Sequence, residues 1–87
     1  MVVFTTARSQ YALDPGLGLL MQFPGGTQCG LAQGEWHPVR WSRPPADGER
    51  FFCFVTPRDG AGPVPIRTGS VTWVGPAPLA PPNARTA

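Results

Sequence analysis

The sequence contains no lysine, so all seven of its basic side chains are arginines. It contains one histidine and two cysteines, and these are the side chains that most often serve as general bases, nucleophiles and zinc ligands. No apolar run approaches the roughly 18 residues that a membrane-spanning helix needs. The first ten residues, MVVFTTARSQ, lack the basic segment and apolar core of a secretory signal. These absences argue against catalysis, metal binding, export and membrane insertion.

The composition also shows a bias toward small and turn-forming residues. Tyrosine occurs once, whereas glycine occurs 11 times and proline 12 times. Together with the arginines, this pattern is typical of translation from a GC-rich gene, so the missing lysine is not evidence of arginine-specific recognition. The formal net charge of +2 is too small to indicate a nucleic-acid or membrane partner by itself.

Proline or glycine interrupts nearly every apolar run, and no window carries the spacing of an amphipathic helix. The runs are short and rich in Val, Phe, Trp and Thr, which is typical of β-strands bounded by turns. We therefore predict an all-β domain over residues 1–74, built as a small SH3-like barrel or sandwich of about six short antiparallel strands. Residues 75–87 are rich in proline and are expected to form an extended or disordered tail. The expected strands span residues 2–6, 10–13, 17–23, 36–41, 49–56 and 64–74.

Turn chemistry adds three local predictions. Residues 14–16 (DPG) suit a type II turn, with proline and glycine at the two central positions. Residues 47–48 (DG) suit a hairpin turn between the fourth and fifth strands. Pro38 cannot donate to a strand ladder, so the fourth strand is expected either at a sheet edge or to begin only at Val39.

The strand at residues 49–56 is apolar on both faces, so we predict that it is central and covered on both sides. Alternation also assigns the faces of the strand at residues 17–23. In the fifth strand one face carries Phe51, Cys53 and Val55, and the other carries Phe52 and Phe54. In the third strand one face carries Leu17, Leu19, Met21 and Phe23, and the other carries Leu20 and Gln22.

The last predicted strand, VPIRTGSVTWV, loses its alternation at Gly69 and Ser70. One extra residue at that point restores a single apolar face, and glycine tolerates such a bulge. We therefore predict a bulged strand whose terminal tryptophan fills the core. The residues brought together in this way are Ile66, Thr68, Val71 and Trp73.

Cys29, His37 and Cys53 are the only candidates for nucleophilic or zinc chemistry. A Cys29–His37 dyad lacks any family motif around it, and three ligands without a CxxC pair fall short of a structural zinc site. We expect no enzyme activity, no metal and no cofactor. A Cys29–Cys53 disulfide is a further alternative, although two cysteines without an export signal are more often reduced thiols.

A binding surface is the stronger functional prediction. Aromatic and arginine side chains are enriched at protein interfaces and on single-stranded nucleic-acid platforms. The fourth and fifth strands are expected to bring Arg40 near Arg50. In the alternative interpretation the tryptophans are core residues, which we favour for Trp41 and Trp73. The predicted partner-binding residues are Trp36, His37, Arg40, Arg43 and Arg50, with Trp36 as the exposed anchor.

Two segments carry a resemblance to small uncharacterised β-rich proteins of actinobacteria and their phages. The first is VVFTTARSQYALD, and the second is IRTGSVTWV. Together they cover about a quarter of the chain, and the resemblance implies a phage or mobile-element context without catalytic residues to transfer. The matching positions are Thr5, Thr6, Ser9, Tyr11 and Asp14, then Arg67, Thr68, Ser70, Val71 and Val74.

We therefore predict a non-enzymatic, phage-type accessory protein that binds another protein. It would either inhibit a host factor or join a capsid or tail as an accessory or decorating subunit. It would act in the host cytoplasm or the virion, without a membrane partner, and homo-oligomerisation is left open. The alternative is a small nucleic-acid-binding β-barrel that uses an arginine–tryptophan face.

Overall fold

The computed structural model describes residues 1–27, 30–57, 60 and 62–76. Within these ranges every helix or strand element is a β-strand, which confirms the predicted all-β class. No helix in the described part of the chain has the length and apolar character needed to cross a membrane. The predicted tail at residues 75–87 falls mostly outside the described residues. The strands are β1 (Val2–Thr5), β2 (Gln10–Asp14), β3 (Leu19–Gln22), β4 (Trp36–Trp41), β5 (Arg50–Val55), β6 (Val64–Ser70) and β7 (Trp73–Gly75).

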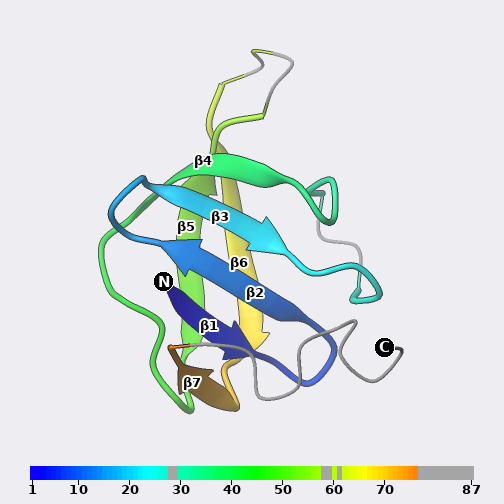
Figure 1. Cartoon of the computed structure of the whole chain (residues 1–87), viewed down its shortest axis with the longest axis vertical. Helices are drawn as coiled ribbons and strands as arrows, with labels where there is room; N and C mark the ends of the chain where they lie inside the picture. The colour runs from blue at the N-terminus through cyan, green and yellow to red at the C-terminus, as the bar shows by residue number, and fades with distance from the viewer. Residues whose placement is uncertain (28–29, 58–59, 61, 77–87) are drawn as a thin grey trace.

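The seven strands form one antiparallel sheet in the order β6-β5-β4-β3-β2-β1-β7. β4 joins the two halves of this sheet, because residues 36–38 pair with β3 whereas residues 39–41 pair with β5. In Figure 1, β1, β2 and β3 cross in front of β5 and β6, so the sheet folds over on itself around β4. The result is a small β-barrel, as the sequence predicts.

The link between β6 and β7 closes the barrel. The Val71 N–H donates to the Glu49 carbonyl at 2.8 Å, and the Gly48 N–H donates to the Val71 carbonyl at 2.7 Å. The Thr72 N–H then donates to the Thr5 carbonyl at 2.8 Å. The chain therefore leaves β6 beside the start of β5 and enters β7 beside β1. This link connects β6 and β7, the two outermost strands of the sheet.

The core lies between the two halves of the folded sheet. It is built from alternate residues of the strands, with one residue from the loop before β4 and one from the link between β6 and β7. Trp41 packs against this core while staying partly exposed, which agrees with the expectation that it is a core residue. The core residues are Phe4, Tyr11, Leu13, Leu20, Leu31, Val39, Phe51, Cys53, Val55, Ile66 and Val71.

The predicted bulge is present in β6. Arg50 pairs with Ser70, but Phe52 pairs with Arg67, so β6 carries one more residue than β5 between these two pairs. The extra residue keeps the inward face apolar across the irregularity. As predicted, Ile66, Thr68 and Val71 are buried.

The prediction that Trp73 fills the core is wrong. β6 ends before this residue, and the link to β7 turns the chain, so there are seven strands instead of six. Val74 packs against the core, which places Trp73 on the outer face by alternation. The indole is half-buried and lies against Gly75, where an added Cβ would overlap the ring. Val71, which is fully buried, occupies the core position instead.

The connection between β2 and β3 differs from the predicted type II turn. That turn requires a positive φ at Gly16, but the positive φ occurs at Gly18, at +66°. The Gly18 N–H donates to the Asp14 carbonyl at 2.8 Å, and the Leu17 N–H donates to the Asp14 carboxylate at 3.1 Å. The carboxylate therefore stabilises a wider four-residue loop over residues 15–18.

Pro38 lies inside β4, a central strand that begins at Trp36, so both predicted alternatives, an edge position and a start only at Val39, are wrong. It pairs with Leu19 of β3, and its carbonyl accepts a hydrogen bond from the Thr56 N–H at 2.9 Å on the β5 side. The nitrogen of a strand residue points to the same side as its carbonyl, so the missing N–H also faces β5. The ladder to β5 begins only at Val39, and the proline is tolerated where β4 changes partner.

Candidate binding surface

β5 presents two phenylalanines on the outside of the barrel. The predicted alternation is confirmed, because Phe51 and Cys53 are buried whereas Phe52 and Phe54 are 40% and 42% exposed. The prediction that both faces of this strand are covered is therefore wrong. An antiparallel strand of a barrel needs only its inner face covered. The two outer rings contact each other edge to face, with centroids 5.1 Å apart and planes at 80°.

Arginines from three strands surround this aromatic pair. Arg40 pairs with Phe54 across the ladder between β4 and β5, and Arg67 pairs with Phe52 across the ladder between β5 and β6. The guanidinium carbon of Arg67 lies 5.6 Å from the Phe52 ring centroid, which is a cation–π contact. Arg50 and Phe52 line one shallow depression. We name Arg40, Arg50, Phe52, Phe54 and Arg67 the arginine–phenylalanine face.

The charges on this face are largely uncompensated. Arg43, in the loop before β5, lies with its Nη2 3.4 Å from Glu49 Oε1, and both side chains are exposed. Solvent screens such a pair, so it contributes little to stability. It is the only ion pair among the described residues, and Arg40, Arg50 and Arg67 therefore have no carboxylate partner there. The face carries a positive potential as a result.

The expected proximity of Arg40 and Arg50 needs correction. Arg40 lies opposite Phe54, and Arg50 is four residues earlier on β5. At about 3.3 Å per residue, this separation is roughly 13 Å along the strand. The outward side chains of Phe52 and Phe54 lie between the two positions, so the arginines flank the aromatic pair.

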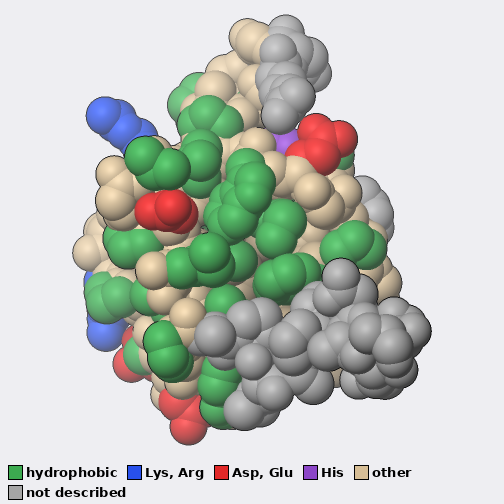
Figure 2. Space-filling model, in the orientation of Figure 1, with side chains coloured by type: hydrophobic (Ala, Val, Ile, Leu, Met, Phe, Trp, Pro, Cys, Tyr) green, Lys and Arg blue, Asp and Glu red, His purple; other side chains and the backbone are tan. Residues whose placement is uncertain are grey.

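Trp36 lies on the other half of the outer surface. It pairs with Met21 of β3, Met21 pairs with Ala12 of β2, and Ala12 pairs with Val3 of β1. These residues alternate with core residues, so they lie on the other face of the sheet, and we name them the apolar row. Val3 and Ala12 are fully buried there. Trp36 and Met21 are half-buried. Figure 2 looks onto β1, β2 and β3 and shows hydrophobic side chains gathered across the centre of this face.

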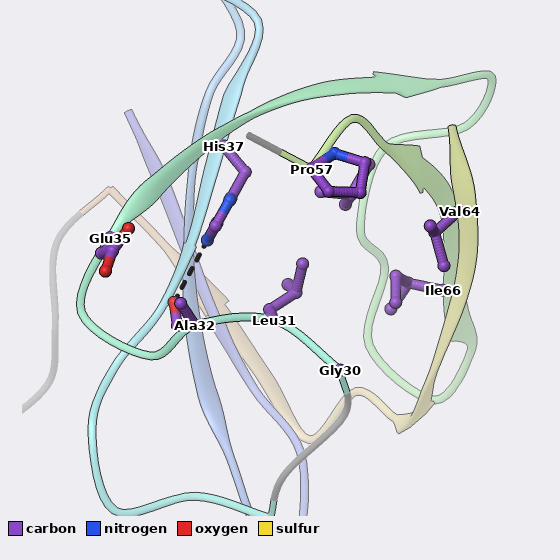
Figure 3. Close-up of a pocket in the computed structure, with 9 residues that line it drawn as sticks. Gly30, Leu31, Ala32, Glu35, His37, Pro57, Val64 and Ile66 are labelled. Atoms are coloured by element: carbon purple, nitrogen blue, oxygen red, sulfur yellow. Dashed lines mark hydrogen bonds between the residues drawn. The ribbon is translucent and has the colours of Figure 1, made fainter. Parts of the chain in front are cut away.

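His37 lies on the inner side of β4, opposite Trp36 and Arg40. It is 5% exposed, and its Nε2 lies 3.1 Å from the Ala32 carbonyl oxygen. The imidazole borders a pocket between the loop at residues 30–35 and the facing ends of β5 and β6 (Figure 3). It therefore does not share a surface with the other four predicted contact residues.

The thiol alternatives involve one cysteine in β5 and one that precedes β4 in the sequence. Cys53 is fully buried within β5. Cys29, on which the dyad, zinc and disulfide alternatives all depend, lies outside the described residues. Over the described ranges no group of three or more His, Cys, Asp or Glu side chains is placed to hold a metal ion.

The predicted site residues are thus divided between two outer surfaces and the interior. Trp36 belongs to the apolar row, Arg40 and Arg50 to the arginine–phenylalanine face, Arg43 to the adjacent loop and His37 to the interior. Sequence reasoning missed the central members of that face, which are Phe52, Phe54 and Arg67. The signal was present, because β5 is apolar at every position from 51 to 55, and only the choice between a covered and an exposed second face was wrong.

Comparisons with protein-family models, with curated proteins and with solved structures gave no match. The proposed function therefore depends on the chemistry of these surfaces.

Proposed function

We propose that this is a non-enzymatic protein that binds another protein through its arginine–phenylalanine face. The observation that carries the proposal is the exposure of Phe52 and Phe54, at 40% and 42%, in the middle of a face bordered by arginines. Aromatic and arginine side chains at the centre of a surface are the residues that most often dominate binding energy. Burying a whole phenylalanine contributes about 1.5–3 kcal/mol, so a partner that covered the exposed two-fifths of each ring would recover roughly 0.6–1.2 kcal/mol per ring.

The chemistry of the face supports one kind of partner. An apolar side chain or loop would cover the aromatic pair, and carboxylates would meet Arg40, Arg50 and Arg67, which have no acidic partner among the described residues. Such charge complementarity raises the association rate and selects against basic partners. We therefore expect a protein whose contact surface combines an apolar anchor with acidic side chains.

Trp36 and Met21, the two half-buried members of the apolar row, extend the contact across β4. The outward residues of β4 run from Trp36, at the end of the apolar row, to Arg40, which lies beside Phe54. A partner that covers both surfaces would bury a strip across the strand that joins the two halves of the barrel. Trp36 would then be a second anchor at the periphery of the contact.

The proposed setting is that of a phage-encoded accessory protein, acting either on a host factor or within a virion. It is supported only by the resemblance of the two terminal segments to β-rich proteins of actinobacteria and their phages. The two roles differ in stoichiometry, because a capsid or tail subunit is present in purified particles and an inhibitor is not. Mass spectrometry of purified particles would separate them.

Affinity capture from host lysate tests the contact surface. We expect Phe54→Ser to reduce recovery of the partner at least tenfold, and Trp36→Ala to reduce it by a smaller factor, because each removes an anchor. The matched control is Leu17→Ser, which changes a 73% exposed apolar residue on the loop between β2 and β3. Equal recovery by wild type, Phe54→Ser and Trp36→Ala, all with unchanged thermal unfolding, would exclude this surface.

Nucleic-acid binding is the second candidate. It is favoured by one observation, namely that the arginines of the face lack carboxylate partners in the part of the chain that the structure describes. It is weakened by another, because Arg67 lies over the Phe52 ring and covers one side on which a base would stack.

A further inference from the structure

The depression beside Arg50 and Phe52 has a volume of about 290 Å³ and lies where the loop before β5 meets β5 and β6. Arg43 lines it from the loop, Arg50 from the first position of β5, and Arg67 from β6. Arg50 and Phe52 are outward residues of β5, and Arg67 pairs with Phe52. Arg50 and Arg67 are therefore diagonal neighbours on the outer face, and three arginines border one space.

Little negative charge offsets these arginines. Glu49 is the only acidic side chain among the described residues that line the depression. It lies 3.4 Å from Arg43 Nη2, but the Arg43 and Glu49 side chains are 79% and 53% exposed, so solvent screens the pair. Arg50 and Arg67 have no ion-pair partner in the part of the chain that the structure describes. The described lining, three arginines and one glutamate, therefore keeps a formal charge of +2.

A phosphate monoester matches this lining better than a carboxylate does. At pH 7 it carries a charge of about −1.5 to −2 and presents three oxygens that accept hydrogen bonds. A carboxylate carries one negative charge and two oxygens, so it would leave part of the positive charge uncompensated. Guanidinium groups bind phosphate oxygens through paired N–H donors, and these charge-assisted hydrogen bonds are among the strongest in proteins. The charge and the number of donors therefore both favour a dianionic group.

We propose that this depression binds a phosphorylated side chain of the partner protein, with the phosphate held between Arg50 and Arg67 and contacted by Arg43. The proposal rests on the proposed function, because the phosphate belongs to the protein that covers the arginine–phenylalanine face. Recognition of phosphorylated segments by clustered arginines is an established mode of peptide binding. Apolar residues next to the phosphorylated one would then contact the aromatic pair.

Two features favour a protein segment over a nucleic-acid strand. The three arginines surround one depression, which suits a single phosphate, whereas a strand presents a row of phosphates that needs an extended basic groove. The guanidinium carbon of Arg67 also lies 5.6 Å from the Phe52 ring centroid, so it occupies a ring face on which a base would stack.

Short peptides test the charge of the ligand. The probes are acetylated pentapeptides, Ala-Leu-Xaa-Leu-Ala, with phosphoserine, phosphotyrosine, glutamate or serine at Xaa, titrated into the intact chain by isothermal calorimetry. We expect at least one phosphopeptide to bind about tenfold more tightly than the glutamate peptide, the effect of one additional charged hydrogen bond. This advantage should disappear at about pH 5, because the second pKa of a phosphate monoester is near 6.

Variants of the exposed arginines locate the phosphate. Arg50→Gln and Arg67→Gln each remove one guanidinium, so each should weaken phosphopeptide binding about tenfold with unchanged thermal unfolding. Arg67→Lys keeps the charge but loses the paired donors, and its affinity should lie between those of wild type and Arg67→Gln. The matched control is Arg8→Gln, on the link between β1 and β2, which changes an exposed arginine outside the depression and should bind as wild type does.

Equal affinity for the phosphorylated and glutamate peptides would overturn the proposal, as would phosphopeptide binding that neither Arg50→Gln nor Arg67→Gln weakens. Tighter binding of oligothymidylate than of either phosphopeptide would assign the depression to nucleic acid instead. Inorganic phosphate that binds as tightly as the phosphopeptides would show that no protein segment is recognised.

Phosphatase treatment of the host lysate separates this proposal from the proposed function. We expect the treatment to reduce recovery of the partner by wild-type protein. Recovery that falls with Phe54→Ser but not with phosphatase would leave the protein-binding face standing and overturn the phosphate site. Phosphopeptide binding without any captured partner would support the site and overturn the proposed function.

Discussion

Gln22 shows how a single buried polar side chain organises two loops. Its side chain is fully buried, and its Nε2 donates to Ser9 Oγ at 3.1 Å and to the Thr27 carbonyl at 2.7 Å. The Thr27 N–H also donates to Ser9 Oγ, at 3.2 Å. Gly26 approaches this network closely, since an added Cβ would lie 2.6 Å from Ser9 Oγ. The amide therefore ties the link between β1 and β2 to the segment after β3.

Replacing this amide should be costly. Gln22→Leu removes both donors and leaves the Thr27 carbonyl and Ser9 Oγ without them, so we expect a loss of about 1–3 kcal/mol in the free energy of unfolding. Urea denaturation measures the change. Gln10→Leu is the matched control, because Gln10 is half-buried on the outer face, and its effect should be within about 0.5 kcal/mol. A loss in Gln10→Leu as large as that in Gln22→Leu would contradict the role of the network.

At the scale of the element, β5 and the segment from β6 to β7 show that alternation in the sequence does not say which face of a strand is buried. The alternation is confirmed along the whole of β5 and in β6 as far as the bulge. In β5 the second apolar face is exposed to solvent. After β6 the alternation is interrupted by residues 71–72, which bond to Glu49 on one side and to Thr5 on the other. A strand pattern gives relative faces, and the neighbouring strands decide which face is inside.

Aspartate placed at position 71 or at position 73 tests which of Val71 and Trp73 fills the core. Val71→Asp would bury a carboxylate in the core, and the cost exceeds what a domain of this size can lose, so we expect no cooperative thermal unfolding. Trp73→Asp places the same group on the outer face and should leave the barrel folded, with a loss of about 1–3 kcal/mol from the half-buried indole. Circular dichroism during heating reports both. A folded Val71→Asp beside an unfolded Trp73→Asp would return Trp73 to the core.

At the scale of the whole molecule, the strand order separates charge from apolar surface. The arginines of β4, β5 and β6 share one outer face, whereas the apolar row crosses β1, β2, β3 and the first residue of β4. β4 contributes to both because it changes partner in its middle. A net charge of only +2 therefore conceals a locally basic surface.

This basic surface gives the nucleic-acid alternative a clear test. If single-stranded DNA binds there, the logarithm of the affinity should fall with the logarithm of salt concentration, with a slope of about −0.7 per neutralised phosphate. Arg40→Ala and Arg50→Ala should each weaken binding and reduce the slope, whereas Arg8→Ala, on the link between β1 and β2, should do neither. Fluorescence anisotropy measures these affinities, and absence of binding to single- and double-stranded probes at low salt removes the alternative.

The sequence by itself determined the all-β class, the positions of the first five strands, the bulge in β6 and the alternation of faces in β5. These depend on periodicity, on β-branched and aromatic residues, and on turn formers, all of which act within a few residues. Only the tertiary structure decided that Val71 and not Trp73 fills the core, that Pro38 lies in a central strand, and that Phe52 and Phe54 face solvent. These outcomes depend on which distant strands pair, because pairing decides which side of each strand is covered, and a local pattern holds no information about that choice.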